Sequence, residues 1–188
     1  MRNNKVATEE VDQKLFETFS RLGYDGTSMD MLSQATGLKK ASLYHRFPNG
    51  KLEMAQHVLG IVEEWIGENI VTVLADKTII PSSRLKKAIS SLNVLYNGGA
   101  NNCLLRTLTV GPDAEVFRGG VTKCFNLITQ SFSDIAVETG LSKTEARKKA
   151  SLVNPLLQGA LVLSGATGDN LHFENCLDNI GQFLQATN

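Results

Sequence analysis

Residues 27–51 hold the side chains of this chain that are best suited to bind another molecule. They carry hydroxyl, amino, phenol and imidazole groups: Thr27, Ser28, Lys39, Lys40, Ser42, Tyr44, His45 and Lys51. Amino, hydroxyl and phenol groups bind phosphate oxygens, and several of these side chains also donate hydrogen bonds to base edges. The segment therefore has the chemistry of a nucleic-acid contact.

Two short helical patterns separated by a glycine would position these side chains. Ser28 can cap the first helix, because its hydroxyl accepts a hydrogen bond from an unpaired backbone N–H group. Gly37 can adopt the left-handed conformation that ends a helix. A second helix over about 39–47 would expose its polar side chains and turn Leu43 and Phe47 to the core. This arrangement is typical of a helix-turn-helix, whose second helix lies in the major groove of DNA.

The same region resembles the TetR family of bacterial transcription regulators. The resemblance lies in the joint spacing of residues within about 8–55: Phe19, Gly23, Tyr24, Thr27, Ser28, Leu32, Ala35, Gly37, Leu38, Lys40, Ala41, Ser42, Leu43, Tyr44, Phe47 and Lys51. The FPNGK sequence at 47–51 looks like the FPxGK junction of one branch, and Lys39 departs from the serine that the family often has. The resemblance implies a homodimeric repressor that a small-molecule effector releases from palindromic double-stranded DNA.

Helical periodicity continues through the rest of the chain and predicts an all-α fold of about nine helices. The pattern indicates a first helix that ends at Gly23, a long helix over 54–73, and a capping box formed by Ser142 and Glu145. We place the functional boundary at the start of the long helix. Residues 1–51 are expected to form a helix-turn-helix DNA-binding domain, and residues 52–188 a helical effector-binding and dimerisation domain.

The last two helical patterns are apolar over more of their circumference than one core contact requires. Small residues there permit close helix approach: Gly159, Ala160, Ser164, Gly165 and Ala166. A single well-packed core is one interpretation. The resemblance favours a four-helix dimer interface, two helices from each subunit. Such a dimer suits DNA, since it presents two recognition helices to half-sites about one helical turn (~34–36 Å) apart.

The proline at position 155 lies inside a helical pattern and predicts a kink that opens space between helices. We expect an effector pocket there, with mostly apolar walls and a few polar groups. Its candidate lining residues are Trp65, Cys103, Phe125, Asn154 and Gln158. Binding would pivot the helix over 54–73 and change the spacing of the recognition helices.

Composition narrows the remaining function classes. The net charge is zero, yet residues 1–51 hold eight Lys/Arg against six Asp/Glu, a balance of +2, and residues 39–51 hold four of these basic residues and no acidic one. The start of the chain lacks the apolar run of a signal peptide, and no stretch reaches the ~18 apolar residues of a spanning helix. These features predict a cytoplasmic protein with no membrane partner.

Three cysteines at wide spacing form neither a disulfide framework nor a metal pattern, so we expect no metal and no cofactor. A thiol-redox-responsive regulator that uses Cys103 or Cys124 is one alternative. A cysteine-dependent enzyme with His172 as its base is another, but no catalytic motif supports it, and we expect no enzymatic activity. A helical adaptor without DNA binding is a third.

Overall fold

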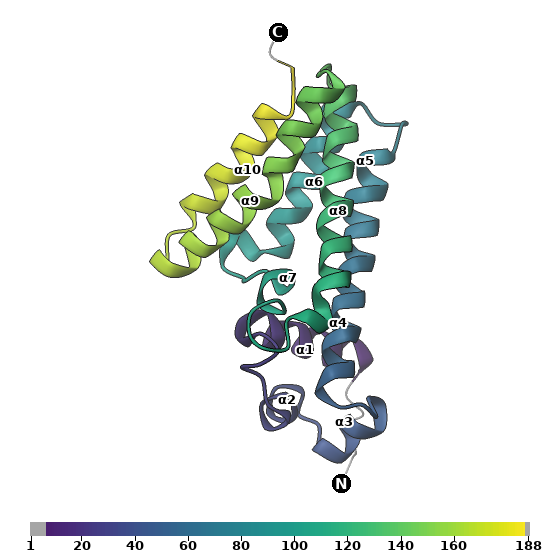
Figure 1. The fold of residues 1–188 in the computed structure, drawn as a ribbon, viewed down its shortest axis with the longest axis vertical. Coiled ribbons are helices and arrows are strands. Elements are labelled where there is room, and N and C mark those ends of the chain that lie inside the picture. The colour runs from purple at the N-terminus through teal and green to yellow at the C-terminus, as the bar shows by residue number, and fades with distance from the viewer. Residues whose placement is uncertain (1–6, 187–188) are drawn as a thin grey trace. The chain divides into compact units, whose positions relative to one another are not determined.

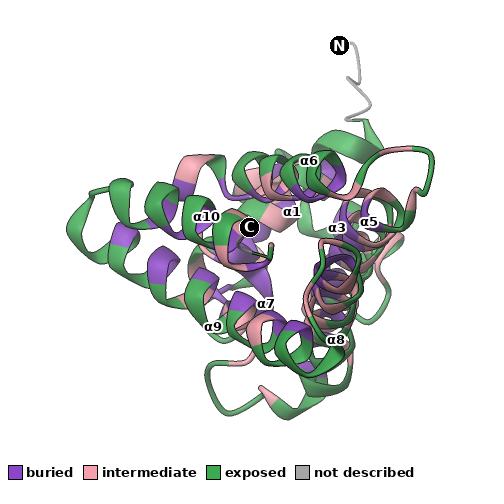
Figure 2. Ribbon diagram, turned by 90° about the horizontal axis from the view of Figure 1, so that it is seen from above, coloured by how far each residue is buried: buried purple, intermediate pink, exposed green. Residues whose placement is uncertain are grey.

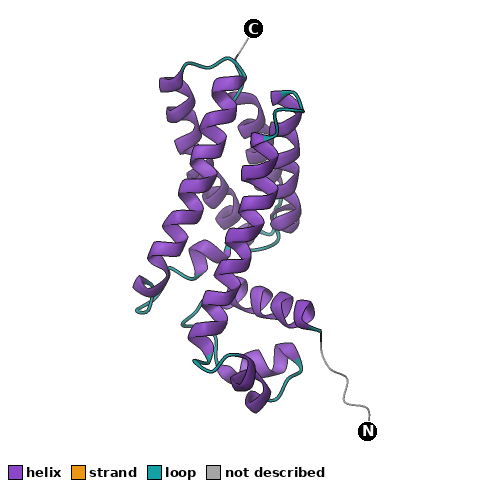
Figure 3. Ribbon diagram, turned by 90° about the vertical axis from the view of Figure 1, so that its right-hand side faces the viewer, coloured by secondary structure: helices purple, strands orange, loops and turns teal. Residues whose placement is uncertain are grey.

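A computed structural model gives the fold of the chain and describes residues 7–186. Figure 3 shows that all regular structure in this range is helical. The helices are α1 (Thr8–Leu22), α2 (Met29–Thr36), α3 (Lys40–Arg46), α4 (Lys51–Ile66), η1 (Gly67–Thr72), α5 (Val73–Ala75), α6 (Pro81–Leu95), η2 (Asn97–Gly99), α7 (Leu104–Thr107), α8 (Glu115–Glu138), α9 (Lys143–Thr167) and α10 (Leu171–Phe183). The predicted all-α fold is confirmed.

The described helices pack as two compact units, whose elements Figure 1 labels. The first unit is the described part of Met1–Val62 together with Leu104–Val121. The second unit is Glu63–Cys103 together with the described part of Thr122–Asn188. These units follow packing and not function, so the functional boundary between 51 and 52 remains a prediction. Residues 1–6 and 187–188, which the predicted domains include, lie outside the described residues.

The first unit is built around α1, whose buried face follows the predicted periodicity. Leu15 and Phe19 are fully buried on this face. The helix ends at Gly23, where φ is 69° and an added Cβ would lie 2.7 Å from the carbonyl oxygen of Thr107. The Thr107 hydroxyl in turn donates to the carbonyl oxygen of Phe19 at 3.1 Å. This close approach explains why a segment 80 or more residues along the chain belongs to the same unit as α1.

In the second unit, α9 and α10 pack against each other through faces that Figure 2 shows as buried. Ser142 caps α9 by accepting from the backbone N–H of Glu145 at 3.3 Å, and its hydroxyl donates to the Glu145 carboxylate at 2.6 Å. The predicted capping box is therefore confirmed. Gly168 adopts the left-handed conformation, with φ 73°, and ends α9 before α10 begins.

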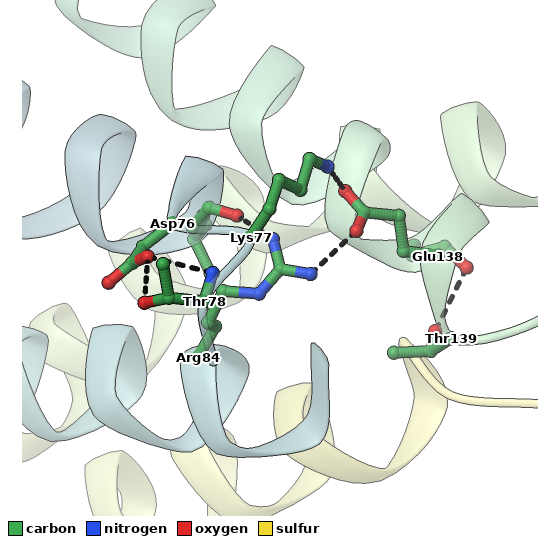
Figure 4. A network of polar contacts seen from close by, with 8 residues as sticks. Asp76, Lys77, Thr78, Arg84, Glu138 and Thr139 are labelled. Carbon is green, nitrogen blue, oxygen red and sulfur yellow. Dashed lines mark hydrogen bonds and ion pairs between the residues drawn. The ribbon is translucent and has the colours of Figure 1, made fainter. Parts of the chain in front are cut away.

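A buried arginine of α6 joins α5 to the last turn of α8 (Figure 4). The guanidinium of Arg84, 2% exposed, donates to the carbonyl oxygen of Leu74 at 2.5 Å and to the Glu138 carboxylate at 2.5 Å. The Lys77 ammonium pairs with the other oxygen of the same carboxylate. Arg84 and then Lys77 lower the pKa of Glu138 below its ordinary value, because both donate hydrogen bonds to the ionised carboxylate.

The predicted long helix spans Lys51–Ala75, but a π-helical segment, η1, interrupts it after its fourth turn. Two side chains bond to backbone carbonyls around this segment. The Asn69 amide donates to the carbonyl oxygen of Trp65 at 3.1 Å, and the Thr72 hydroxyl donates to that of Gly67 at 2.9 Å. They supply donors where the regular i→i−4 pattern is interrupted. Counting Lys51–Ala75 once, the described residues form nine α-helices.

Candidate nucleic-acid interface

The turn between α2 and α3 is held by hydroxyl groups. Ser28 caps α2, its side chain accepting from the backbone N–H of Met31 at 3.3 Å, as predicted. Gly37 ends the helix in the left-handed conformation, with φ 68°. The Ser33 hydroxyl then reaches across the turn and donates to the carbonyl oxygen of Leu38 at 2.6 Å. These bonds fix the direction in which the chain enters α3.

Helix α3 presents the predicted contact residues to solvent. It spans Lys40–Arg46, one residue shorter at each end than the expected 39–47. Leu43 is fully buried and anchors the helix to the core. The polar side chains on the helix and at its N-cap are exposed: Lys39, Lys40, Ser42, Tyr44 and His45. The structure therefore brings five of the eight predicted residues together, four on one short exposed helix and Lys39 at its N-cap.

Lys40 forms an ion pair with Asp30 of α2, with its Nζ 2.6 Å from the carboxylate oxygen. Both side chains are largely exposed, at 47% and 80%. Exposed pairs of this kind contribute at most about 1 kcal/mol, because water screens them. Lys40 can therefore exchange Asp30 for a more strongly charged partner at small cost.

The junction after α3 lets an aromatic ring lie directly on the backbone. Gly50 has φ 64°, and an added Cβ would come within 3.0 Å of the Tyr44 ring. The ring rests against this glycine and remains half exposed. Sequence reasoning missed this role of Gly50, although its place after the Pro48–Asn49 pair was a turn signal.

The side chains of Lys51 and Thr27 form hydrogen bonds to backbone carbonyl oxygens within the first unit. The Lys51 ammonium donates to the carbonyl oxygen of Tyr24 at 2.9 Å and lies 3.9 Å from the centre of the Tyr24 ring. An ammonium has three N–H donors, so this bond does not exhaust its capacity. Thr27 is buried, and its hydroxyl donates to the carbonyl oxygen of Gly23 at 2.6 Å. The hydroxyl proton of Thr27 is therefore already used within the protein. The DNA contact predicted for Thr27 remains a prediction.

The structure brings together two of the five predicted effector residues. The Asn154 amide donates to the carbonyl oxygen of Phe125 at 3.0 Å and to the Thr129 hydroxyl at 3.0 Å. The other three have separate surroundings. Cys103 is buried and accepts from the Tyr96 hydroxyl at 3.4 Å, Trp65 is partly exposed, and the side-chain oxygen of Gln158 is buried without a hydrogen-bond partner.

Burial also raises the pKa of two thiols. Cys103, Cys124 and Cys176 are all buried and free of disulfides. Loss of hydration raises the pKa of Cys124 to about 11 and that of Cys176 to about 11. Both thiols are therefore protonated near neutral pH, the form that does not react as a nucleophile.

Comparisons with known proteins agree with this geometry. A family model described as bacterial regulatory proteins, tetR family, matches residues 15–58, which include α2 and α3. The uncharacterized HTH-type transcriptional regulator YxaF of Bacillus subtilis (strain 168) is 27% identical over 163 residues, 81% of this chain and 83% of YxaF.

Solved structures show the same fold over nearly the whole chain. A TetR transcriptional regulator from Legionella pneumophila is similar with a TM-score of 0.80 and 19% identity, covering 96% of this chain and 98% of that one. A cysteine mutant of the TetR family transcriptional regulator CifR, complexed with a 26-base-pair operator DNA, has a TM-score of 0.72 and 19% identity, with 100% of both chains covered. The FPxGK branch remains a prediction.

Proposed function

Because this chain belongs to the TetR family of bacterial regulatory proteins, we propose that it is a DNA-binding transcriptional regulator, a repressor that a small-molecule effector releases from its operator. One observation carries the proposal. Helix α3 is anchored by buried Leu43, and all its exposed side chains except the small Ala41 are polar or aromatic, within the segment that the family model matches. A regulator of this kind acts where bacterial DNA lies, in the cytoplasm.

The contacts divide by side-chain chemistry. Ser28, Tyr44 and Lys51 are assigned to phosphate oxygens, which position the protein on the duplex. Base edges are assigned to side chains on or beside α3: Lys39, Lys40, Ser42 and His45. Thr27 contributes by holding the segment between α1 and α2, through the hydrogen bond from its hydroxyl to the carbonyl oxygen of Gly23. Residues 1–51 form the DNA-binding domain, and residues 52–188 the effector-binding and dimerisation domain.

The exposed face of α9 supports a homodimer through α9 and α10, which would match a palindromic operator. Four large apolar side chains on α9 are between 42% and 49% exposed: Leu152, Leu156, Val162 and Leu163. Gly159 lies among them with open space where a Cβ would stand. Exposed apolar surface of this extent on one helix is typical of an interaction site. A second copy of α9 would cover it.

The effector is assigned to the pocket predicted from Trp65, Cys103, Phe125, Asn154 and Gln158. The unpartnered side-chain oxygen of Gln158 supports this assignment. Buried acceptors without a donor are uncommon in folded proteins, because the lost hydration is not replaced. An effector with an N–H or O–H group would supply the missing donor.

The thiol-redox and enzymatic alternatives have no comparable support. The three thiols are buried, and two of them have raised pKa values. Redox-sensing and catalytic cysteines need an accessible thiolate. The proposal therefore includes neither activity.

Binding of the native protein to its own upstream DNA tests the proposal. We expect a shift in gel mobility and in fluorescence anisotropy that weakens with rising salt. Lys40→Ala should lose about 1–3 kcal/mol of binding free energy, as for a base-reading residue. Lys86→Ala removes the same charge from an exposed position on α6 and is the matched control. Failure of the folded, effector-free protein to bind this DNA at low salt would refute the proposal.

A further inference from the structure

A polar groove lies between α8 and α9 in the second unit. Its volume is about 620 Å³, which is within the range of small-molecule sites. Its walls carry amide and hydroxyl groups from α8 and two cations from α9: Asn126, Thr129, Gln130, Ser133, Lys143 and Arg147. An adjoining hollow of about 560 Å³ shares Lys143 and Arg147 and adds Lys148.

The lining residues of this groove carry two cations, Lys143 and Arg147, against one carboxylate, Asp134. No ion pair joins Lys143, Arg147 or Lys148 to a carboxylate among residues 7–186. Lys143 and Arg147 are four residues apart on α9, a spacing at which like charges repel. An anion bound beside both cations would relieve this repulsion.

The nearby carboxylates already have hydrogen-bond donors. Glu138 is bound by Arg84 and Lys77, and Glu145 accepts from the Ser142 hydroxyl at 2.6 Å. Asp134 lines the groove itself, and its Oδ1 accepts from the Gln130 amide at 2.8 Å.

The side chains that α8 contributes to the groove can form hydrogen bonds with the hydroxyl groups of a bound ligand. Asn126, Thr129, Gln130 and Ser133 recur at three- and four-residue spacing, so they share one face of the helix. The Thr129 hydroxyl is held in place by the Asn154 amide at 3.0 Å. Amide and hydroxyl side chains both donate and accept, which matches the hydroxyl groups of a polyol.

We propose that this groove binds a small organic anion that carries hydroxyl groups. Its phosphate or carboxylate lies against Lys143 and Arg147, and its hydroxyl groups lie along α8, where Asp134 accepts one of them. The same carboxylate disfavours a long polyanion such as a nucleic acid, since it would repel the phosphates. The site is distinct from the proposed effector pocket, because the residues assigned to that pocket are absent from its walls.

Isothermal titration calorimetry of the full chain at constant ionic strength tests this inference, with glucose 6-phosphate and gluconate as probes for the two anion types. We expect at least one of them to bind once per chain, more tightly than inorganic phosphate, and glucose to bind undetectably. Lys143→Gln combined with Arg147→Gln should weaken the binding by at least about tenfold, because two charged hydrogen-bond donors are lost.

Lys86→Gln combined with Lys87→Gln removes the same charge from exposed positions on α6 and should leave the affinity within about twofold. Circular dichroism melts confirm that each variant is folded, and the assay needs no DNA, so its outcome is independent of the proposed regulator. The inference is overturned if neither probe binds at millimolar concentration, if phosphate alone binds equally well, or if both double variants lose affinity equally.

Discussion

The ion pair between Arg84 and Glu138 allows a quantitative test of what stabilises the second unit. Glu138→Gln keeps the size of the side chain and removes its charge, which leaves the buried guanidinium of Arg84 with neutral acceptors only, among them the carbonyl oxygen of Leu74. Breaking a fully buried pair costs about 3–5 kcal/mol. The Glu138 side chain is 27% exposed, so water screens part of this, and we expect a loss of about 2 kcal/mol.

Thermal and urea unfolding at one protein concentration measure this loss. For a chain of this size, about 2 kcal/mol lowers the Tm by roughly 4–8 °C. Arg84→Met should cost less, because it removes the buried charge and leaves Glu138 with water and Lys77. In the Arg84→Met background, Glu138→Gln should then have little further effect, which gives a coupling free energy of about 2 kcal/mol. Equal cost of Glu138→Gln in both backgrounds would refute this reasoning.

The same pair predicts the direction of a pH effect. The folded pKa of Glu138 lies below its ordinary value of 4.5, since Arg84 and Lys77 stabilise the carboxylate. Its contribution to the free energy of unfolding is therefore present above that value and is lost as the pH falls through the lowered folded pKa. Glu138→Gln should flatten this part of the stability profile, and an unchanged slope would contradict the assignment.

Three further outcomes follow from particular contacts. Gly99→Ala should cost about 1–3 kcal/mol in urea unfolding, because φ is 95° and the new Cβ would lie 2.7 Å from the Cβ of Phe173, whereas Gly98→Ala, which meets open space, should cost less. Leu156→Glu combined with Leu163→Glu should give a helical monomer by light scattering, and a persisting dimer would exclude the α9 face as the interface. Thiol reagents should label the native protein far more slowly than the unfolded one, and fast native labelling would contradict the burial of all three cysteines.

Local signals made much of the fold predictable from the sequence. The cap at Ser28, the capping box at Ser142 and the left-handed ends at Gly37 and Gly168 depend on a few neighbouring residues, so their side-chain chemistry decides them. The buried face of α1 followed from apolar periodicity. The exposure of α3 followed in the same way, because its only large aliphatic side chain, Leu43, is the buried one.

The remaining features depend on contacts distant in the sequence. The Lys51 ammonium binds the carbonyl oxygen of Tyr24, which lies 27 residues earlier in the chain. Its orientation therefore depends on where the fold places Tyr24. The membership of residues 104–121 in the first unit depends on the approach of Thr107 to Gly23. The π-helical segment has no sequence signature, since i→i−4 and i→i−5 bonding use the same residue types.

That π-helical segment has a geometric consequence for the long helix. Ile66, Ile70 and Leu74 are buried and four residues apart, and in a regular α-helix each such step rotates the side chain about 40° around the axis. The wider turn at Gly67–Thr72 holds more residues per revolution and opposes this rotation. The buried side chains of the long helix can thus stay in line along the helix axis without supercoiling of the helix. Deleting a single residue from Gly67–Thr72 would rotate the following part of the helix by about 100° around its axis.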